Sequence, residues 1–203
     1  MDRFKIIAVT DAGICAENIF DRVEKLSSLS GIDGIILRAR ELDGSAYEAA
    51  AYEAVKRCKK TGNAGKLIMH YHYSLSVRLG LGVQLPMDIL SKITCTKDSS
   101  FIGASVHSAD EAKYAEDLGA AYAVFGHIFD TACKPGLMPR GPDRLTGIVN
   151  SVRIPVYAIG GINPGNIRDV RDAGAAGACI MSGFMKCEDP EAYTEELMNA
   201  LKE

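Results

Sequence analysis

Short apolar runs alternate with longer amphipathic segments along the whole chain. The apolar runs are typical of buried parallel strands, whereas the segments between them carry apolar residues at helical spacing. In the first such segment, Ile19, Val23, Leu26 and Leu29 would form one face of a helix. The strands that this pattern predicts are residues 4–11, 34–40, 66–70, 82–85, 101–107, 122–125, 154–161 and 177–183.

Local signals mark the starts of several predicted helices. A serine, asparagine or aspartate accepts hydrogen bonds from the first free N–H groups of a helix, and proline fits its first turn. Glu111 follows Ser108 at the spacing of a capping box. We therefore expect helices to start at Ser45, Ser108, Asn163 and Asp189.

Eight strand–helix pairs in a chain of 203 residues favour a (β/α)8 TIM barrel, with a closed parallel sheet inside a ring of helices. No linker divides the chain, so residues 1–203 are predicted to form a single domain. The main alternative is a doubly wound open sheet, which normally carries G-x-G-x-x-G after its first strand. Residues 10–13, Thr-Asp-Ala-Gly, do not match that pattern, and we favour the barrel.

Charge and hydropathy narrow the class of ligand. The net charge is -3 and no run of Lys or Arg is longer than two, so the sequence offers no basic surface for nucleic acid or a membrane. No segment reaches the roughly 18 apolar residues that span a bilayer, and the N-terminus lacks the pattern of a signal peptide. We expect a cytoplasmic protein that binds a small molecule; a homodimer is compatible with the sequence, which carries no mark of one.

The cysteines do not suggest a metal site. The chain has 6 cysteines and no C-x-x-C pair, which argues against a zinc knuckle or a disulfide framework. We expect reduced thiols at Cys15, Cys58, Cys95, Cys133, Cys179 and Cys187.

Polar residues gather at the C-terminal ends of the predicted strands, where barrel enzymes place their sites. The end of the sixth strand is the richest, because a His, an Asp, a Thr, a Cys and a Lys follow residues 122–125 within a short stretch. Other strand ends contribute arginines, histidines and a glutamine. The set includes Arg38, Arg40, His70, Gln84, Ser105, His107, His127, Thr131 and Lys134.

The seventh and eighth strands end in small residues. Backbone N–H groups beside glycine can approach an anion closely, and a following helix adds partial positive charge. We therefore expect Gly160, Gly161, Met181 and Ser182 to hold a phosphate. The alternative is that the two glycines only form a tight turn.

Four stretches together resemble one known family. They are residues 125–136 (Phe-Gly-His-Ile-Phe-Asp-Thr-Ala-Cys-Lys-Pro-Gly), 103–108 (Gly-Ala-Ser-Val-His-Ser), 155–161 (Pro-Val-Tyr-Ala-Ile-Gly-Gly) and 180–182 (Ile-Met-Ser). The resemblance is to the family of thiamine phosphate synthase and the thiazole tautomerase TenI, and it covers nearly the whole chain. It implies a (β/α)8 barrel, in agreement with the strand pattern.

The two branches of this family differ at a few positions. The synthases join a pyrimidine pyrophosphate to a thiazole phosphate, hold Mg²⁺ with carboxylates, and carry Q-x-R-x-K, N-D and G-Q-x-D. A hard cation needs oxygen ligands, and several of these positions have lost them here. The sequence therefore argues against the synthase, because it has Ile36-Leu-Arg38-Ala-Arg40, His70-Tyr71 and Gln84-Leu-Pro-Met-Asp88 in those places.

His127 and Cys133 match the tautomerase pattern F-G-H-[IV]-F-x-T-x-C-K. The resemblance thus implies a thiazole tautomerase, an isomerase that aromatises a thiazole phosphate carboxylate without metal or other cofactor. An imidazole can both accept and donate a proton at neutral pH, so His127 is the predicted general acid/base. The predicted binding residues are Arg38, Arg40, Ser105, Thr131, Lys134, Gly160, Gly161, Met181 and Ser182.

Two other functions remain open. One is a thiamine phosphate synthase with substitute Mg²⁺ ligands such as Asp11 or Asp88. The other is a barrel that has lost catalysis and binds thiazole phosphates or a protein partner in a regulatory role. A separate alternative concerns His127, which at a strand end could be a hydrogen-bonded structural residue.

Three further features have a plain structural interpretation beside a functional one. His70 and His72 lack a nearby carboxylate, so we predict a surface position rather than a metal pair. Cys133 has no dedicated base beyond His127 and is not expected to be a nucleophile. Residues 135–142, rich in Pro and Gly, are predicted to form a loop that can act as a lid.

Overall fold

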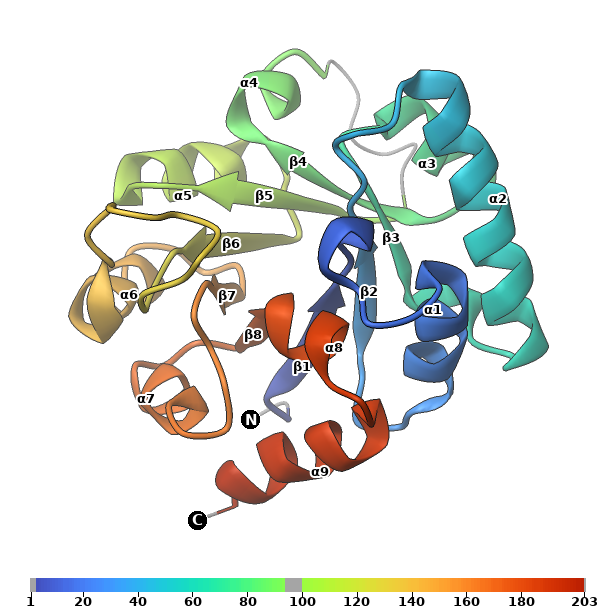
Figure 1. The fold of residues 1–203 in the computed structure, drawn as a ribbon. Helices are drawn as coiled ribbons and strands as arrows, with labels where there is room; N and C mark the ends of the chain where they lie inside the picture. The colour runs from blue at the N-terminus through green and yellow to red at the C-terminus, as the bar shows by residue number, and fades with distance from the viewer. Residues whose placement is uncertain (1–2, 94–99, 203) are drawn as a thin grey trace.

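Figure 1 shows the computed structural model, which describes residues 3–93 and 100–202. Eight parallel strands pair in chain order and β1 closes on β8, which confirms the predicted (β/α)8 barrel. Each strand is a little shorter than its apolar run. The strands are β1 (Lys5–Val9), β2 (Gly34–Leu37), β3 (Leu67–His70), β4 (Gly82–Pro86), β5 (Ile102–Val106), β6 (Tyr122–Gly126), β7 (Val156–Ile159) and β8 (Gly177–Ile180).

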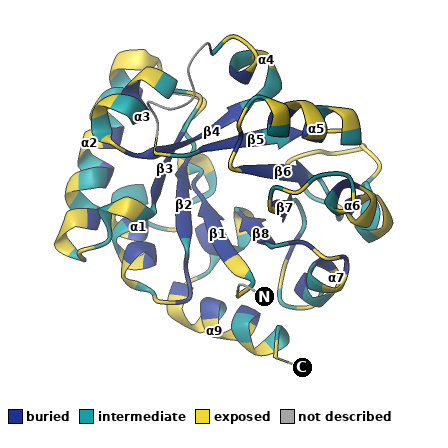
Figure 2. Ribbon diagram, turned by 180° about the vertical axis from the view of Figure 1, so that it is seen from behind, coloured by how far each residue is buried: buried dark blue, intermediate teal, exposed yellow. Residues whose placement is uncertain are grey.

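The helices surround the barrel, and their outer faces are exposed while the strands are buried (Figure 2). Short 3-10 turns η1 (Ala12–Ile14) and η2 (Ala64–Lys66) follow β1 and precede β3. The helices are α1 (Ile19–Ser28), α2 (Gly44–Lys60), α3 (Tyr73–Leu79), α4 (Met87–Leu90), α5 (Ala109–Asp117), α6 (Gly141–Val149), α7 (Ile167–Asp172), α8 (Ser182–Lys186) and α9 (Pro190–Ala200).

Two of the predicted helix starts are correct and two are wrong. Ser108 accepts from the N–H of Glu111 at 3.1 Å, and Asp189 caps α9. In contrast, α2 is capped by Asp43, whose carboxylate accepts from the N–H of Ala46 at 2.9 Å and from the Ser45 hydroxyl. An aspartate next to a serine is an equally good cap, so the local signal did not decide between them.

The start predicted at Asn163 is also wrong, because α7 begins at Ile167 after Asn166. The Asn163 side chain accepts from the N–H of Gly165 at 2.8 Å, and the Asn166 side chain accepts from the N–H of Asn163 at 2.8 Å. These two bonds stabilise a turn over residues 163–166, which takes the place of the predicted first helical turn.

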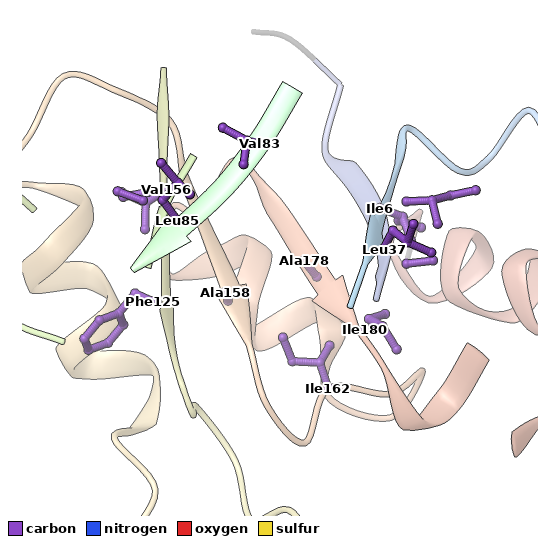
Figure 3. Close-up of a cluster of buried hydrophobic side chains, with 14 of the residues drawn as sticks. Ile6, Leu37, Val83, Leu85, Phe125, Val156, Ala158, Ile162, Ala178 and Ile180 are labelled. Atoms are coloured by element: carbon purple, nitrogen blue, oxygen red, sulfur yellow. The ribbon is translucent and has the colours of Figure 1, made fainter. Parts of the chain in front are cut away.

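The core has two parts, one between strands and helices and one inside the barrel. Outward-facing side chains such as Ile6, Leu85 and Phe125 pack under the helices (Figure 3). Inward-facing side chains fill the barrel and close the floor of its C-terminal end. They are Ile7, Val9, Ile36, Ile68, Tyr122, Val124, Tyr157 and Cys179.

Glycines inside the barrel make room for two large rings. A Cβ on Gly103 would lie 2.1 Å from the ring of Tyr122, and one on Gly177 would lie 2.7 Å from the ring of Tyr157. The two tyrosine rings meet edge to face at 5.2 Å. The barrel interior is therefore packed, and a ligand has access only at an end.

The sequence predicted reduced cysteines and no membrane-spanning segment. The described cysteines are free thiols, while Cys95 lies outside the described residues. Over the described ranges, no helix is long and apolar enough to cross a bilayer.

Candidate active site

A pocket of about 330 Å³ opens at the C-terminal ends of the strands. Its floor is the inward-facing layer of the barrel, which Val9, Ile36 and Cys179 supply, and its rim is built from the strand–helix loops. All of the site residues that the sequence predicted lie in its lining: Arg38, Arg40, Ser105, His127, Thr131, Lys134, Gly160, Gly161, Met181 and Ser182. The structure thus brings together residues from five strand ends, although it does not by itself assign their roles.

The ends of β7 and β8 form the side predicted to hold a phosphate. Gly160 and Gly161 have φ values of 101° and 70°, which favour glycine. A Cβ on Gly160 would lie 2.4 Å from the Cβ of His127, and one on Gly161 would lie 2.5 Å from the carbonyl of Asp130. The absence of a Cβ at these two positions therefore lets the loop after β6 pack closely against the end of β7. The glycines thus have a packing role in addition to any role in a tight turn or in anion binding.

Two arginines follow β2 and both line the pocket. Arg38 is fixed, because its guanidinium pairs with Asp11 at 2.5 Å and its backbone N–H donates to the Thr10 hydroxyl at 2.8 Å. Arg40 is more exposed, and its guanidinium lies 5.8 Å from the centroid of the Tyr71 ring. Within the described part of the chain Arg40 makes no ion pair, so its charge remains available to an anion.

The prediction that His70 lies at the surface is wrong, because this residue lines the pocket at the end of β3. Burial, with smaller contributions from the charges of Arg40 and Arg38, lowers the pKa of His70 from 6.5 to about 3. His72 instead stacks on the Tyr47 ring at 3.9 Å. The two imidazoles therefore face different surroundings, and His70 is a neutral group in the site.

The depressed pKa of His70 predicts an acid-sensitive contribution to stability. The unfolded chain binds a proton at this side chain below about pH 6.5, whereas the folded chain does so only near about pH 3. Between these values the free energy of unfolding falls as the pH falls, because protons favour the unfolded state. Urea denaturation across this range should show a smaller fall for His70→Gln than for the wild type; superimposable curves would contradict the assignment.

Ser105 and Gln84 are joined across neighbouring strands. Gln84 is 3% exposed and its side-chain amide donates to the Ser105 hydroxyl at 2.9 Å. In the described structure the side-chain oxygen of Gln84 has no hydrogen-bond partner. The sequence placed Gln84 at a strand end but assigned it no role in the site. Because side chains alternate along a strand, the pattern of β4 could have predicted that Gln84 faces the pocket.

His127 lies in the loop between β6 and α6, drawn in yellow in Figure 1. Its Nε2 lies 3.1 Å from the carbonyl of Leu137, so the imidazole links the start of the loop to its far end. Arg140 holds that end, because its guanidinium donates to the carbonyls of Gly126 at 2.9 Å and His107 at 3.0 Å. His127 therefore has a structural contact within the loop, and its role in the site stays a prediction.

The same loop, part of which lines the pocket, carries two exposed apolar side chains. Leu137 is 57% exposed and Met138 is 88% exposed, while Arg140 fixes the next turn. If this segment closes over a bound anion, chymotrypsin cleavage within residues 136–141 should slow several-fold in saturating inorganic pyrophosphate. Mass spectrometry of the fragments measures this; equal cleavage rates with and without the anion would remove the lid hypothesis.

Comparison with known proteins places this geometry in a family. A family model described as thiamine monophosphate synthase matches residues 6–184. The thiamine-phosphate synthase of Fusobacterium nucleatum is 31% identical over 199 residues, which cover 96% of this chain and 95% of that protein. The one from Pyrococcus horikoshii is 37% identical over 160 residues, with coverages of 75% and 76%.

A solved structure agrees with these sequence relatives. The thiamine phosphate pyrophosphorylase from Pyrococcus furiosus superimposes with a TM-score of 0.81 at 28% identity, and the match covers 98% of this chain and 96% of that chain. The relatives thus carry the name of the transferase.

The isomerase interpretation from the sequence is therefore wrong. It rested on the missing synthase motifs and on His127 and Cys133, whereas relatives matched over nearly the full chain are named thiamine-phosphate synthase. The general acid/base role of His127 was predicted for the tautomerase reaction, and it is withdrawn together with that reaction. What the fold, the pocket and the comparisons establish together is that this chain belongs to the thiamine monophosphate synthase family.

Proposed function

We propose that this protein is a thiamine-phosphate synthase, which joins a pyrimidine carried as its pyrophosphate ester to a thiazole phosphate. The observation that carries the proposal is the pocket of about 330 Å³, whose lining combines glycines from the end of β7 with cations from the loops after β2 and β6. Each substrate brings one anionic group, and the lining supplies both backbone N–H groups beside glycines and cationic side chains to bind them.

The reaction needs a leaving group and a nucleophile held in line. The bond between the pyrimidine methylene carbon and the pyrophosphate oxygen breaks, and the electron pair leaves with pyrophosphate. A new bond forms between that carbon and the thiazole nitrogen, so no proton transfer to carbon is required. The protein contributes by orienting both substrates and by compensating the charge that develops on pyrophosphate.

We assign the residues according to their positions in the pocket. The backbone at Gly160, Gly161 and Ser182 would bind the phosphate of the thiazole, as the sequence predicted. Arg40 and Lys134 would contact pyrophosphate, because both line the pocket and the described structure gives neither side chain an acidic partner.

The family also implies Mg²⁺, and the residues present do not fit it. No carboxylate from the described residues lines the pocket, and these residues include no group of three or more His, Cys, Asp or Glu that could hold a metal. The substitute ligands considered above fail as well, since Asp11 is paired with Arg38 and Asp88 lies outside the lining. We therefore derive no step through a metal ion.

The proposal is tested by incubating the purified protein with both substrates and measuring pyrophosphate together with thiamine phosphate by mass spectrometry. We expect equal amounts of the two products and a loss of at least about tenfold in rate for Arg40→Ala, because a charge-assisted hydrogen bond contributes roughly 1.5–3 kcal/mol. Arg144→Ala, which changes an exposed arginine of α6 outside the pocket, is the matched control. The absence of thiamine phosphate both with and without Mg²⁺ would overturn the proposal.

A further inference from the structure

The pocket collects positive charge without a balancing acid. Among the described residues its charged lining consists of Arg38, Arg40 and Lys134, and it includes no Asp or Glu. The acid next to this group, Asp11, is engaged by Arg38 at 2.5 Å and leaves the other two cations uncompensated. A divalent cation entering this space would meet positive charges and no free carboxylate, whereas an anion would meet donors.

Two polar residues at the end of β3, next to the arginines, also line the pocket. His70 has a pKa lowered to about 3 by burial and by the nearby arginines, so it adds no charge near neutral pH. Tyr71, at a φ of 69°, lies beside His70 with ring centroids 4.4 Å apart and below the guanidinium of Arg40. A left-handed conformation is unusual for tyrosine, and here it places the ring where it supports the arginine.

The donors present suit a polyanion better than a metal. Guanidinium groups offer several N–H donors in a fixed plane and bind phosphate oxygens in pairs. Mg²⁺ requires oxygen ligands and is usually held through one or two carboxylates together with substrate phosphates. The charged lining supplies guanidinium and ammonium groups where such a site needs carboxylates.

We infer that this pocket binds the pyrophosphate end of its ligand directly through Arg40 and Lys134, without a divalent cation. The inference rests on the proposed function for the identity of the anion, and it departs from the metal dependence that the family implies. The fixed pair of Arg38 with Asp11 positions the β2 end from which Arg40 extends. Because Arg40 and Lys134 are exposed, the contact is sensitive to ionic strength.

Isothermal titration with inorganic pyrophosphate tests the inference on the intact protein. We expect binding in EDTA at least as tight as in excess MgCl2, and a fall in affinity of about tenfold or more for Arg40→Met and for Lys134→Met. Arg40→Lys, which keeps the charge but loses the planar donors, should lie between Arg40→Met and the wild type. Arg144→Met is the matched control and should bind like the wild type.

Turnover of the two proposed substrates, measured in parallel in EDTA and in MgCl2, separates the inference from the function. Turnover in both conditions supports both. Turnover and pyrophosphate binding in MgCl2 alone overturn the metal-free inference and leave the function standing. Binding of pyrophosphate in EDTA without turnover in either condition supports the inference about the anion and overturns the proposed synthase activity.

Discussion

Replacing Gly126 by alanine is expected to destabilise the protein by about 3 kcal/mol or more. A Cβ at this position would lie 2.1 Å from the carbonyl oxygen of Ile159, which is backbone of the neighbouring strand β7 and cannot rotate away. Relief of the clash requires β6 and β7 to separate where they pair. Urea denaturation of the purified variant measures the loss.

The effect should extend from the fold to the site. Gly126 precedes His127, and its carbonyl accepts from Arg140 at 2.9 Å, so a shift at the end of β6 displaces the loop that lines the pocket. We therefore expect weaker binding of pyrophosphate as well as lower stability.

Gly147 provides a matched control with the opposite sign. It is exposed within α6, and a Cβ there would meet nothing within 4 Å. Because alanine favours a helix over glycine, Gly147→Ala should stabilise the protein by about 0.5–1 kcal/mol. If Gly126→Ala is as stable as Gly147→Ala, β6 and β7 do not approach each other closely enough at Gly126 to exclude a Cβ.

The sequence predicted the barrel and the content of its pocket well, for a simple geometric reason. In a closed parallel sheet every strand ends at the same rim, so residues far apart in the chain, such as Arg38 and Ser182, converge without any knowledge of their contacts. The strand pattern alone was therefore sufficient to collect the predicted site residues.

Contacts between loops could not be predicted in the same way. The pairing of Arg38 with Asp11 depends on the conformation of two loops, and the burial of His70 depends on neighbours from other elements. Asn163 shows the related limit of local signals, because its side chain stabilises a turn as readily as it caps a helix. Such choices are made by tertiary packing.

The sequence was weakest in choosing between branches of one family. His127 and Cys133, together with the missing synthase motifs, were given decisive weight, but His127 makes a loop contact with Leu137 and Cys133 is exposed at the rim. A histidine and a cysteine at these two positions are therefore not enough to distinguish a tautomerase from a synthase. The similarity of the whole chain to the synthases outweighs these two side chains.

Replacing Arg22 by methionine is the second change with a large expected effect, a loss of about 3–5 kcal/mol in the free energy of unfolding. Arg22, on α1, is 1% exposed, and its guanidinium donates to the carbonyls of Phe184 at 3.0 Å and Cys187 at 2.8 Å. Its Nε also lies 2.7 Å from a carboxylate oxygen of Glu17, with which it forms an ion pair. Methionine fills a similar volume but leaves these acceptors unsatisfied.

The loss should be accompanied by a change at the pocket, because Phe184 belongs to α8, whose first residue is Ser182. The control is Arg3→Met, since the Arg3 side chain is 55% exposed and its ion pair with Asp33 should contribute no more than about 1 kcal/mol. Urea denaturation and phosphate binding, measured on both variants, separate the two cases. Equal stability of the two variants would show that the buried guanidinium does not hold α8 against α1. The residues predicted to bind phosphate, at the ends of β7 and β8, would then have to be positioned by the packing of these two strands alone.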